Sequence, residues 1–96
     1  MPNDTATIQI TGHARARLDQ RRIPAAAVEA VLTYGRRAYV RGTQIRAIGR
    51  REVERFQAKG IDLRAFEGLQ VLVDASGETV ITAYRNHDFR GLKGAW

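Results

Sequence analysis

The sequence predicts an α+β domain in which an N-terminal helical hairpin packs on a twisted antiparallel sheet of about four strands. Two patterns lead to this class. Apolar residues recur at helical spacing over residues 11–34, and alternating strand patterns follow at 37–48 and 69–84. A length of 96 residues adds a third observation, because it leaves room for one modest core. Residues 1–96 are therefore expected to form a single domain.

The first predicted helix runs from about residue 13 to residue 22. Thr11 precedes it as a candidate N-cap, because its hydroxyl can accept a hydrogen bond from a free N–H of the first turn. Ala14 and Leu18 lie four residues apart on the side that should face the core. Pro24 ends this helix, because proline disfavours helical backbone in the residue before it.

A second helix is predicted over residues 25–32, starting directly after that proline. The stretch is rich in alanine, and Val28, Val31 and Leu32 fall on one face. Gly35 is predicted to end the helix in a left-handed conformation, which glycine adopts without steric cost. The apolar face of this hairpin requires a sheet as its partner.

Strand patterns supply that sheet. Residues 7–11 are expected to form a short edge strand or an extended lead-in, and strands are expected at 37–41, 44–48, 69–73 and 79–84. Residues 52–59, between the two halves of the sheet, are predicted to form a short helix, with a long loop as the alternative. The last two strands flank turn residues 74–77 and form a hairpin. The simplest register puts these side chains on the core face: Leu69, Val71, Val73, Ile81 and Ala83. Gln70 and Thr82 mark the other face as more open. By the same alternation Arg85 falls on the core side, and only a bulge, a strong twist or the end of the strand would turn it to solvent.

The net charge of +6 comes almost entirely from arginine, which supplies 14 of the 16 basic residues. A guanidinium group is a planar fork that binds phosphates through paired hydrogen bonds and stacks on bases, so this bias favours a nucleic-acid partner. The alternative is that arginine replaces lysine throughout a GC-rich genome. Composition alone leaves both open.

Three groups of basic residues stand out, and two of them contain a histidine. They are the helical stripe His13, Arg17 and Arg21; the run Arg36, Arg37, Arg41, Arg46, Arg50, Arg51 and Arg55; and the strand-end cluster Arg85, His87 and Arg90. Guanidinium groups can hold the phosphates of RNA, while an imidazole can move the proton of a 2′-hydroxyl. The alternative is that these groups are ordinary solvated surface.

The position of His13 in the first turn of its predicted helix bears on the charge of its imidazole. Both the positive helix end and Arg17 disfavour a second positive charge there. We therefore expect a neutral imidazole at pH 7 that can accept a proton. The alternative is that His13 only caps or packs the start of the helix.

Several classes of function are not expected. The chain has no cysteine for a disulfide or a thiolate metal site, and its two separated histidines give no metal-ligand spacing, so neither metal nor cofactor is predicted. No apolar run reaches membrane-spanning length, and the first residues lack the pattern of a secretory signal. A cytoplasmic protein without a membrane partner is the expectation.

Four stretches of the chain have a familiar pattern: His13-Ala14-Arg15-Ala16-Arg17-Leu18, Gln20-Arg21-Arg22-Ile23-Pro24, Val28-Glu29-Ala30-Val31-Leu32 and Val80-Ile81-Thr82-Ala83-Tyr84-Arg85. With these stretches the chain resembles the RelE-like toxin superfamily, small bacterial ribonucleases that pair with an antitoxin and cut messenger RNA, many of them on the ribosome. The most similar branch is a bacterial family of uncharacterised domains linked to that superfamily. The resemblance implies a RelE-like fold.

The resemblance also implies a site. Arg85-Asn86-His87 is similar to the arginine-x-histidine that contributes to catalysis in ribosome-dependent members, although Asp88-Phe89 stands where such members have a tyrosine directly after the histidine. No match for their catalytic glutamate is identified. Four residues are the catalytic candidates: His87 as general acid or base, Arg85 on phosphate, and His13 with Arg17 as a second pair. The candidate nucleic-acid contacts are Arg21, Arg37, Arg41, Arg46, Arg50 and Arg51.

The expected function is therefore that of a toxin-like, RNA-directed domain, in the form of a metal-independent endoribonuclease with RNA, the ribosome and an antitoxin protein as partners. One alternative is a basic module that binds RNA or an acidic protein without catalysis. Another is an interaction protein that docks a partner chain through its open sheet face or Trp96.

Overall fold

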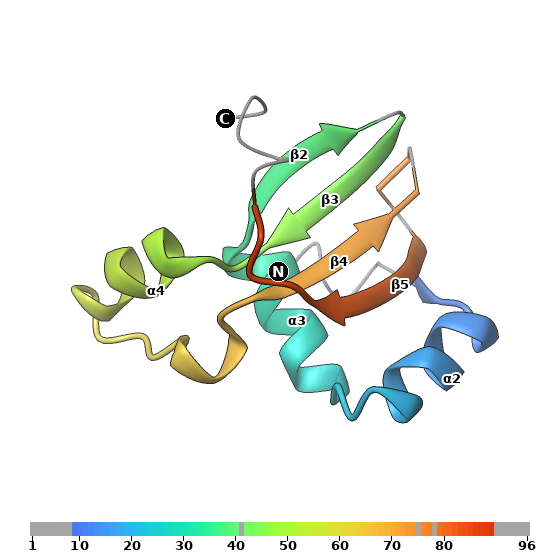
Figure 1. Ribbon diagram of the computed structural model, residues 1–96, viewed down its shortest axis with the longest axis horizontal. Helices are drawn as coiled ribbons and strands as arrows, with labels where there is room; N and C mark the ends of the chain where they lie inside the picture. Colours follow the sequence, from blue (N-terminus) through green and yellow to red (C-terminus); the bar gives the residue numbers. More distant parts are fainter. Residues whose placement is uncertain (1–8, 41, 75, 78, 90–96) are drawn as a thin grey trace, which may run out of the picture.

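A computed structural model of the chain describes residues 9–40, 42–74, 76–77 and 79–89 and confirms the α+β class (Figure 1). Along the chain the elements are β1 (Gln9–Ile10), α2 (Gly12–Gln20), α3 (Ala25–Tyr34), β2 (Arg36–Val40), β3 (Thr43–Ala47), α4 (Arg50–Gln57), the 3₁₀ helix η1 (Arg64–Phe66), β4 (Leu69–Val73) and β5 (Thr79–Arg85). Both helices of the hairpin and the short helix between the sheet halves are present as predicted. Among these elements, none is a helix with the length and apolar content needed to cross a membrane.

The sheet has the strand order β1-β5-β4-β3-β2. The four strands β2 to β5 are antiparallel to their neighbours, as the sequence predicted. The two residues of β1 add a parallel pairing at the free edge of β5. Because β3 and β4 are adjacent but joined through α4 and η1, the residues around that connection gather at one end of the sheet.

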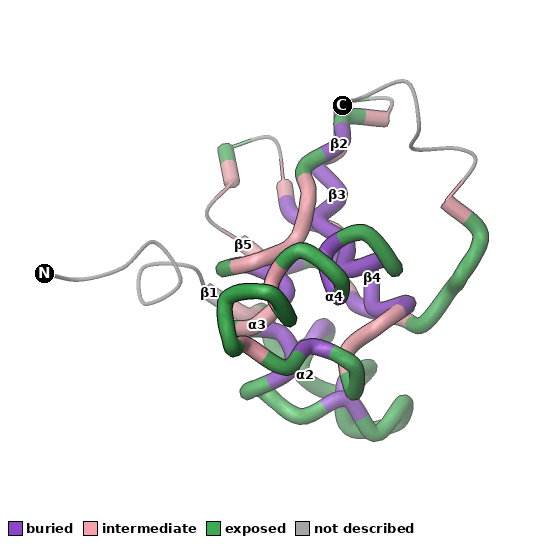
Figure 2. Tube along the Cα trace, turned by 90° about the vertical axis from the view of Figure 1, so that its left-hand side faces the viewer, coloured by how far each residue is buried: buried purple, intermediate pink, exposed green. Residues whose placement is uncertain are grey.

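The two helices of the hairpin cover one face of this sheet, and the core lies between these layers (Figure 2). The hydroxyl of Thr11 accepts a hydrogen bond from the Ala14 N–H at 3.0 Å, which confirms Thr11 as the N-cap of α2. Leu18 on α2 and Val31 on α3 are buried against the sheet. Leu63, just before η1, is buried in the same core and closes its edge.

Gly35 ends α3, but the predicted left-handed cap is wrong. Its backbone has φ −70° and ψ 151°, an extended conformation open to any residue. The reason for glycine is close approach: a Cβ there would lie 2.5 Å from the Val31 carbonyl oxygen and 3.0 Å from the Ala47 carbonyl oxygen. The absence of a side chain therefore lets the chain turn from α3 directly onto the edge of β3.

The register of the β4–β5 hairpin contains a bulge that the sequence analysis did not place. Val73 pairs with Val80 and Leu72 with Thr82, so Ile81 is the extra residue of β5. Val80 is therefore buried in the core, whereas Ile81 is 41% exposed, and the prediction of Ile81 on the core face is wrong. Arg85 pairs with Leu69 at the last position of β5, where the strand ends and its side chain is exposed.

The second face of the sheet is partly covered by the chain that follows β5, residues 86–89, which we call the strap. Figure 1 shows it running from the end of β5 across the sheet towards the start of β2. Gln70 on this face is only 3% exposed, and its side-chain amide donates to the Asn86 carbonyl at 2.9 Å. The expectation that Gln70 marks an open face is therefore wrong, because the strap lies over it.

Tyr84 lies on the same face and donates its hydroxyl hydrogen bond to Gln70 Oε1 at 3.2 Å. Burial raises the pKa of the Tyr84 phenol, and the positive charge of Arg21 opposes this effect in part. The folded pKa thus exceeds the unfolded value of about 10, so the folded state holds this proton more tightly. Its contribution to stability is complete below about pH 10 and is lost as the pH rises through the folded pKa.

We therefore expect Tyr84→Phe to remove the tyrosine that ionises at raised pH and to flatten the loss of unfolding free energy above about pH 10. Ultraviolet difference titration and denaturant unfolding at several alkaline pH values measure the two effects. Tyr39 is 64% exposed, so Tyr39→Phe is the matched control and should leave the raised ionisation in place. A raised ionisation that persists in Tyr84→Phe would contradict the assignment.

Candidate functional site

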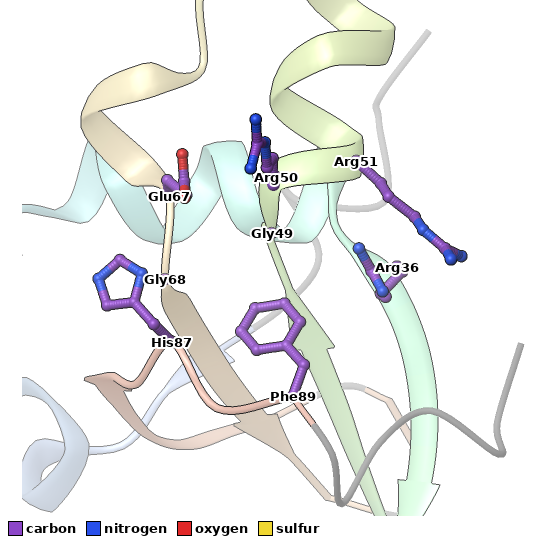
Figure 3. Close-up of a pocket in the computed structure, with 8 residues that line it drawn as sticks. All are labelled: Arg36, Gly49, Arg50, Arg51, Glu67, Gly68, His87 and Phe89. Atoms are coloured by element: carbon purple, nitrogen blue, oxygen red, sulfur yellow. The ribbon is translucent and has the colours of Figure 1, made fainter.

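A pocket of about 260 Å³ lies at the end of the sheet where β2 and β4 begin and where β3 and β5 end (Figure 3). It lies between the first turn of α4, the connection from η1 to β4, and the strap. The described residues that line it are Arg36, Gly49, Arg50, Arg51, Glu67, Gly68, His87 and Phe89. An imidazole, a carboxylate, an aromatic ring and three guanidinium groups therefore come together from four separate segments.

Two glycines make room for the two rings of the strap. A Cβ at Gly68 would lie 2.6 Å from the ring of His87, and a Cβ at Gly49 would lie 2.5 Å from the ring of Phe89. Gly68 also has φ +89°, a conformation that side chains rarely allow. Both rings thus lie directly against main chain, on two neighbouring strand ends that are joined by a hydrogen bond from the Gly68 N–H to the Ile48 carbonyl at 2.8 Å.

The strap itself is fixed on the side that precedes His87. The Asn86 N–H donates to the Gly68 carbonyl at 2.7 Å, and the Asn86 carbonyl accepts from Gln70. The side chain of Asn86 accepts from the Asp88 N–H at 2.9 Å, which closes a local turn around His87. His87 therefore has an anchored backbone and an exposed imidazole, as a proton-transfer group requires.

The most buried charges of the pocket neutralise each other. Arg36 donates from Nε to Glu52 Oε2 at 2.8 Å and from Nη2 to Oε1 at 2.7 Å, and these side chains are only 12% and 9% exposed. Glu52 also accepts from the Gly49 N–H at 2.8 Å, so it caps the helix that it belongs to. The bidentate ion pair between Arg36 and Glu52 is therefore a structural part of the pocket wall.

The exposed charges of the pocket lie at its rim. Arg50 and Arg51 occupy the first turn of α4, where the helix end adds a partial positive charge. Arg50 contacts Glu54 at 3.1 Å, but these side chains are 85% and 65% exposed, so solvent screens this pair. In Figure 3, Glu67 and Arg50 point to the same side of the pocket, and Arg51 extends outward on the side away from His87.

The second predicted catalytic pair lies elsewhere. His13 and Arg17 are exposed on α2, and they are not among the described residues that line the pocket. Figure 1 shows α2 and α4 at opposite ends of the sheet. The structure therefore does not bring the two histidines into one site.

Two of the predicted nucleic-acid contacts are held by the fold. Arg46 is 5% exposed, and its guanidinium donates to the Leu32 carbonyl at 2.8 Å and to Gln44 Oε1 at 2.6 Å. It cannot reach a phosphate at the surface, so we exclude it from the site. Arg21 donates to the Ala83 carbonyl at 2.7 Å, which ties the end of α2 to β5.

The remaining candidates differ in position. Arg37 is exposed on β2, and Arg85 is exposed at the end of β5, just before the strap. Arg41, together with Arg90 and Trp96, lies outside the described residues. Of the predicted contacts, Arg50 and Arg51 are the two that line the pocket with His87.

Glu67 and Phe89 line the pocket but were not predicted from the sequence. Glu67 precedes a strand as a lone carboxylate, and no motif spacing connects it to His87 twenty residues later. Phe89 gave a weak signal in the sequence. It is two residues after His87, and on an extended chain two such residues point to the same side. Only the pairing of β4 with β5 shows that both belong to the pocket.

No cluster of three or more histidine and carboxylate side chains in the described part of the chain could hold a metal ion. Comparison of the chain with models of protein families, with curated proteins and with solved structures gives no significant match. The pocket is therefore the feature of the molecule from which a function is inferred.

Proposed function

We propose that the protein is a RelE-like, toxin-like endoribonuclease that cuts RNA in the pocket between α4 and the strap without a metal ion. One observation carries the proposal: an exposed imidazole and a half-buried carboxylate share a pocket with two exposed guanidinium groups. These are the groups that RNA transesterification requires, namely a base, an acid and cations for the phosphate. The resemblance of the sequence to RelE-like toxins points to the same chemistry.

In the proposed reaction Glu67 removes the proton from the 2′-hydroxyl, and the 2′-oxygen forms a bond to phosphorus. The bond between phosphorus and the 5′-oxygen breaks, and His87 donates a proton to that leaving oxygen. The products are a 2′,3′-cyclic phosphate and a 5′-hydroxyl, so atoms and charge balance. Arg50 stabilises the extra negative charge of the transition state, which is where electrostatic groups have their largest effect.

Contacts outside the reacting phosphate complete the proposal. Arg51 at the rim holds a neighbouring phosphate of the RNA, and Arg85 at the end of β5 contacts the RNA backbone on the other side of the strap. RNA is the substrate, on the ribosome or free of it, and an antitoxin protein is the proposed protein partner. The roles proposed for Arg51 and Arg85 are supported by their positions, since Arg51 is exposed at the pocket and Arg85 is exposed next to the strap.

The proposal is tested with the purified protein and a labelled RNA, with and without ribosomes, and EDTA is added only to the ribosome-free reaction because ribosomes themselves require Mg²⁺. We expect cleavage in at least one of the two conditions, no effect of EDTA on ribosome-free cleavage, and 2′,3′-cyclic phosphate ends on the product. Absence of cleavage in both conditions, ribosome-free cleavage that EDTA abolishes, or a product without cyclic phosphate ends would contradict the proposed reaction.

A second candidate is a non-catalytic RNA-binding module. Several exposed arginines lie outside the pocket and could hold phosphates without chemistry: Arg15, Arg17, Arg22, Arg37 and Arg55. This reading predicts salt-sensitive RNA binding that survives the loss of both histidines. RNA binding without cleavage in the experiment above would favour it.

A further inference from the structure

We propose that Arg36 is a positioning residue that holds the two sides of the pocket in fixed relation, and that it does not bind phosphate. The catalytic part of this inference rests on the proposed function, whereas the structural part stands on the contacts alone. A guanidinium in the wall of an RNA pocket would ordinarily be assigned to phosphate. The contacts of Arg36 point to a different role.

On one side, Arg36 holds the start of α4. Both of its hydrogen bonds to Glu52 are short, and the same carboxylate accepts from the Gly49 N–H, directly before the helix. Because Arg50 and Arg51 are the first residues of that helix, the orientation of their backbone depends on this capped turn. Arg36 therefore fixes the helix end that presents the two exposed cations.

On the other side, Arg36 holds the strap. Its Cζ lies 5.3 Å from the centroid of the Phe89 ring, a distance at which cation and ring attract each other. Phe89 also packs against the small apolar cluster of Ala38, Ile45 and Ala47 on the second face of the sheet. Asn86 anchors the other end of the strap, so His87 is held between two fixed points.

The charge of Arg36 is already opposed by Glu52 within a side-chain pair that is about nine-tenths buried. A phosphate would have to compete with a bidentate carboxylate, which is among the strongest partners of a guanidinium. Arg50 and Arg51 are exposed and carry no such buried pair. The pocket thus has one cation that supports its wall and two that are exposed at its rim.

Arg36→Lys distinguishes the two roles, because lysine keeps the charge but lacks the planar fork and its stacking face. For RNA cleavage we expect kcat to fall by about ten-fold to a hundred-fold with little change in KM, as a displaced catalytic group would give. The double change Arg36→Met with Glu52→Leu removes the cation together with its buried counter-charge, and we expect it to keep the slope of the salt dependence of RNA binding. Arg51→Ala is the matched comparison and should reduce that slope by about 0.7, the value for one phosphate contact on a single strand.

A second measurement does not depend on RNA. Ring resonances of His87 are followed by NMR in Arg36→Lys and in Phe89→Leu, which leaves the Arg36–Glu52 pair intact, and those of Phe89 are followed in Arg36→Lys. Circular dichroism reports whether each variant is folded. We expect the His87 signals to shift or broaden in each folded variant and those of His13, outside the pocket, to stay unchanged. If the intact protein neither binds nor cleaves RNA, the proposed function fails, and this measurement still decides the role of Arg36.

Three results would overturn the inference: a salt slope in the Arg36→Met, Glu52→Leu double variant that falls as in Arg51→Ala, an unchanged kcat of Arg36→Lys in an enzyme that cleaves RNA, or unchanged His87 signals in the folded variants. If Arg36→Lys does not fold, Phe89→Leu still tests whether the contact between Arg36 and the strap positions His87. The expected results are the same, namely a lower kcat and changed His87 signals.

Discussion

Replacement of Glu52 by alanine is expected to lower the free energy of unfolding by about 3–5 kcal/mol, because it leaves the guanidinium of Arg36 buried without its counter-charge. The same change removes the acceptor of the Gly49 N–H at the start of α4. For a domain of this size the loss is a large part of a total stability of about 5–15 kcal/mol. Urea unfolding of the variant and the intact protein measures the difference.

The same helix offers a matched control. Glu54→Ala removes an acidic partner of Arg50 from an exposed pair, and its effect should stay within about 0.5 kcal/mol. The double change Arg36→Met with Glu52→Leu replaces the buried pair by apolar side chains, and it should recover much of the stability lost in Glu52→Ala. Equal effects of Glu52→Ala and Glu54→Ala would show that the buried pair has no special role.

Gly35→Ala is expected to destabilise the protein by about 1–3 kcal/mol, towards the upper end of that range. The added Cβ would meet the Val31 carbonyl oxygen at 2.5 Å and main-chain atoms of Ala47 at 3.0 and 3.1 Å. Main-chain atoms cannot rotate away as a side chain can, so the end of α3 must separate from β3. Thermal or urea unfolding reports this loss.

Gly12→Ala is the corresponding control. Gly12 is exposed at the start of α2, and nothing lies within 4 Å of a Cβ added there. Alanine also has the higher helix propensity, so the variant should be as stable as the intact protein or slightly more stable. If Gly12→Ala cost as much as Gly35→Ala, the close approach at Gly35 would not be the cause.

The sequence predicted the elements of this fold well because their signals are local. Thr11 and Pro24 mark helix starts by their own side chains, and the turn residues at 74–77 lie between two alternating strands. The errors arise where the deciding contact comes from another part of the chain. The bulge at Ile81 depends on the register with β4, and the requirement at Gly35 comes from the backbone of Ala47.

The pocket was predicted only in part for the same reason. His87, Arg50 and Arg51 were identified by residue type, since imidazole and guanidinium groups suit RNA wherever they occur. Arg46 has the same chemistry as Arg50, but its place on the helix-covered face of β3 buries it under α3. Residue type therefore identified the candidate residues, whereas side-chain exposure and the order of the strands determine which of these residues line the pocket.

The most direct test of the proposed pocket compares RNA cleavage by two single-histidine variants, His87→Ala and His13→Ala, in the condition where the intact protein is active. Both imidazoles are exposed, and of these two only His87 lines the pocket. Loss of a general acid should slow cleavage by His87→Ala by about 10²-fold to 10⁴-fold, while His13→Ala keeps the rate of the intact protein. Full activity in His87→Ala, or an equal loss in both variants, would contradict the assignment of catalysis to this pocket.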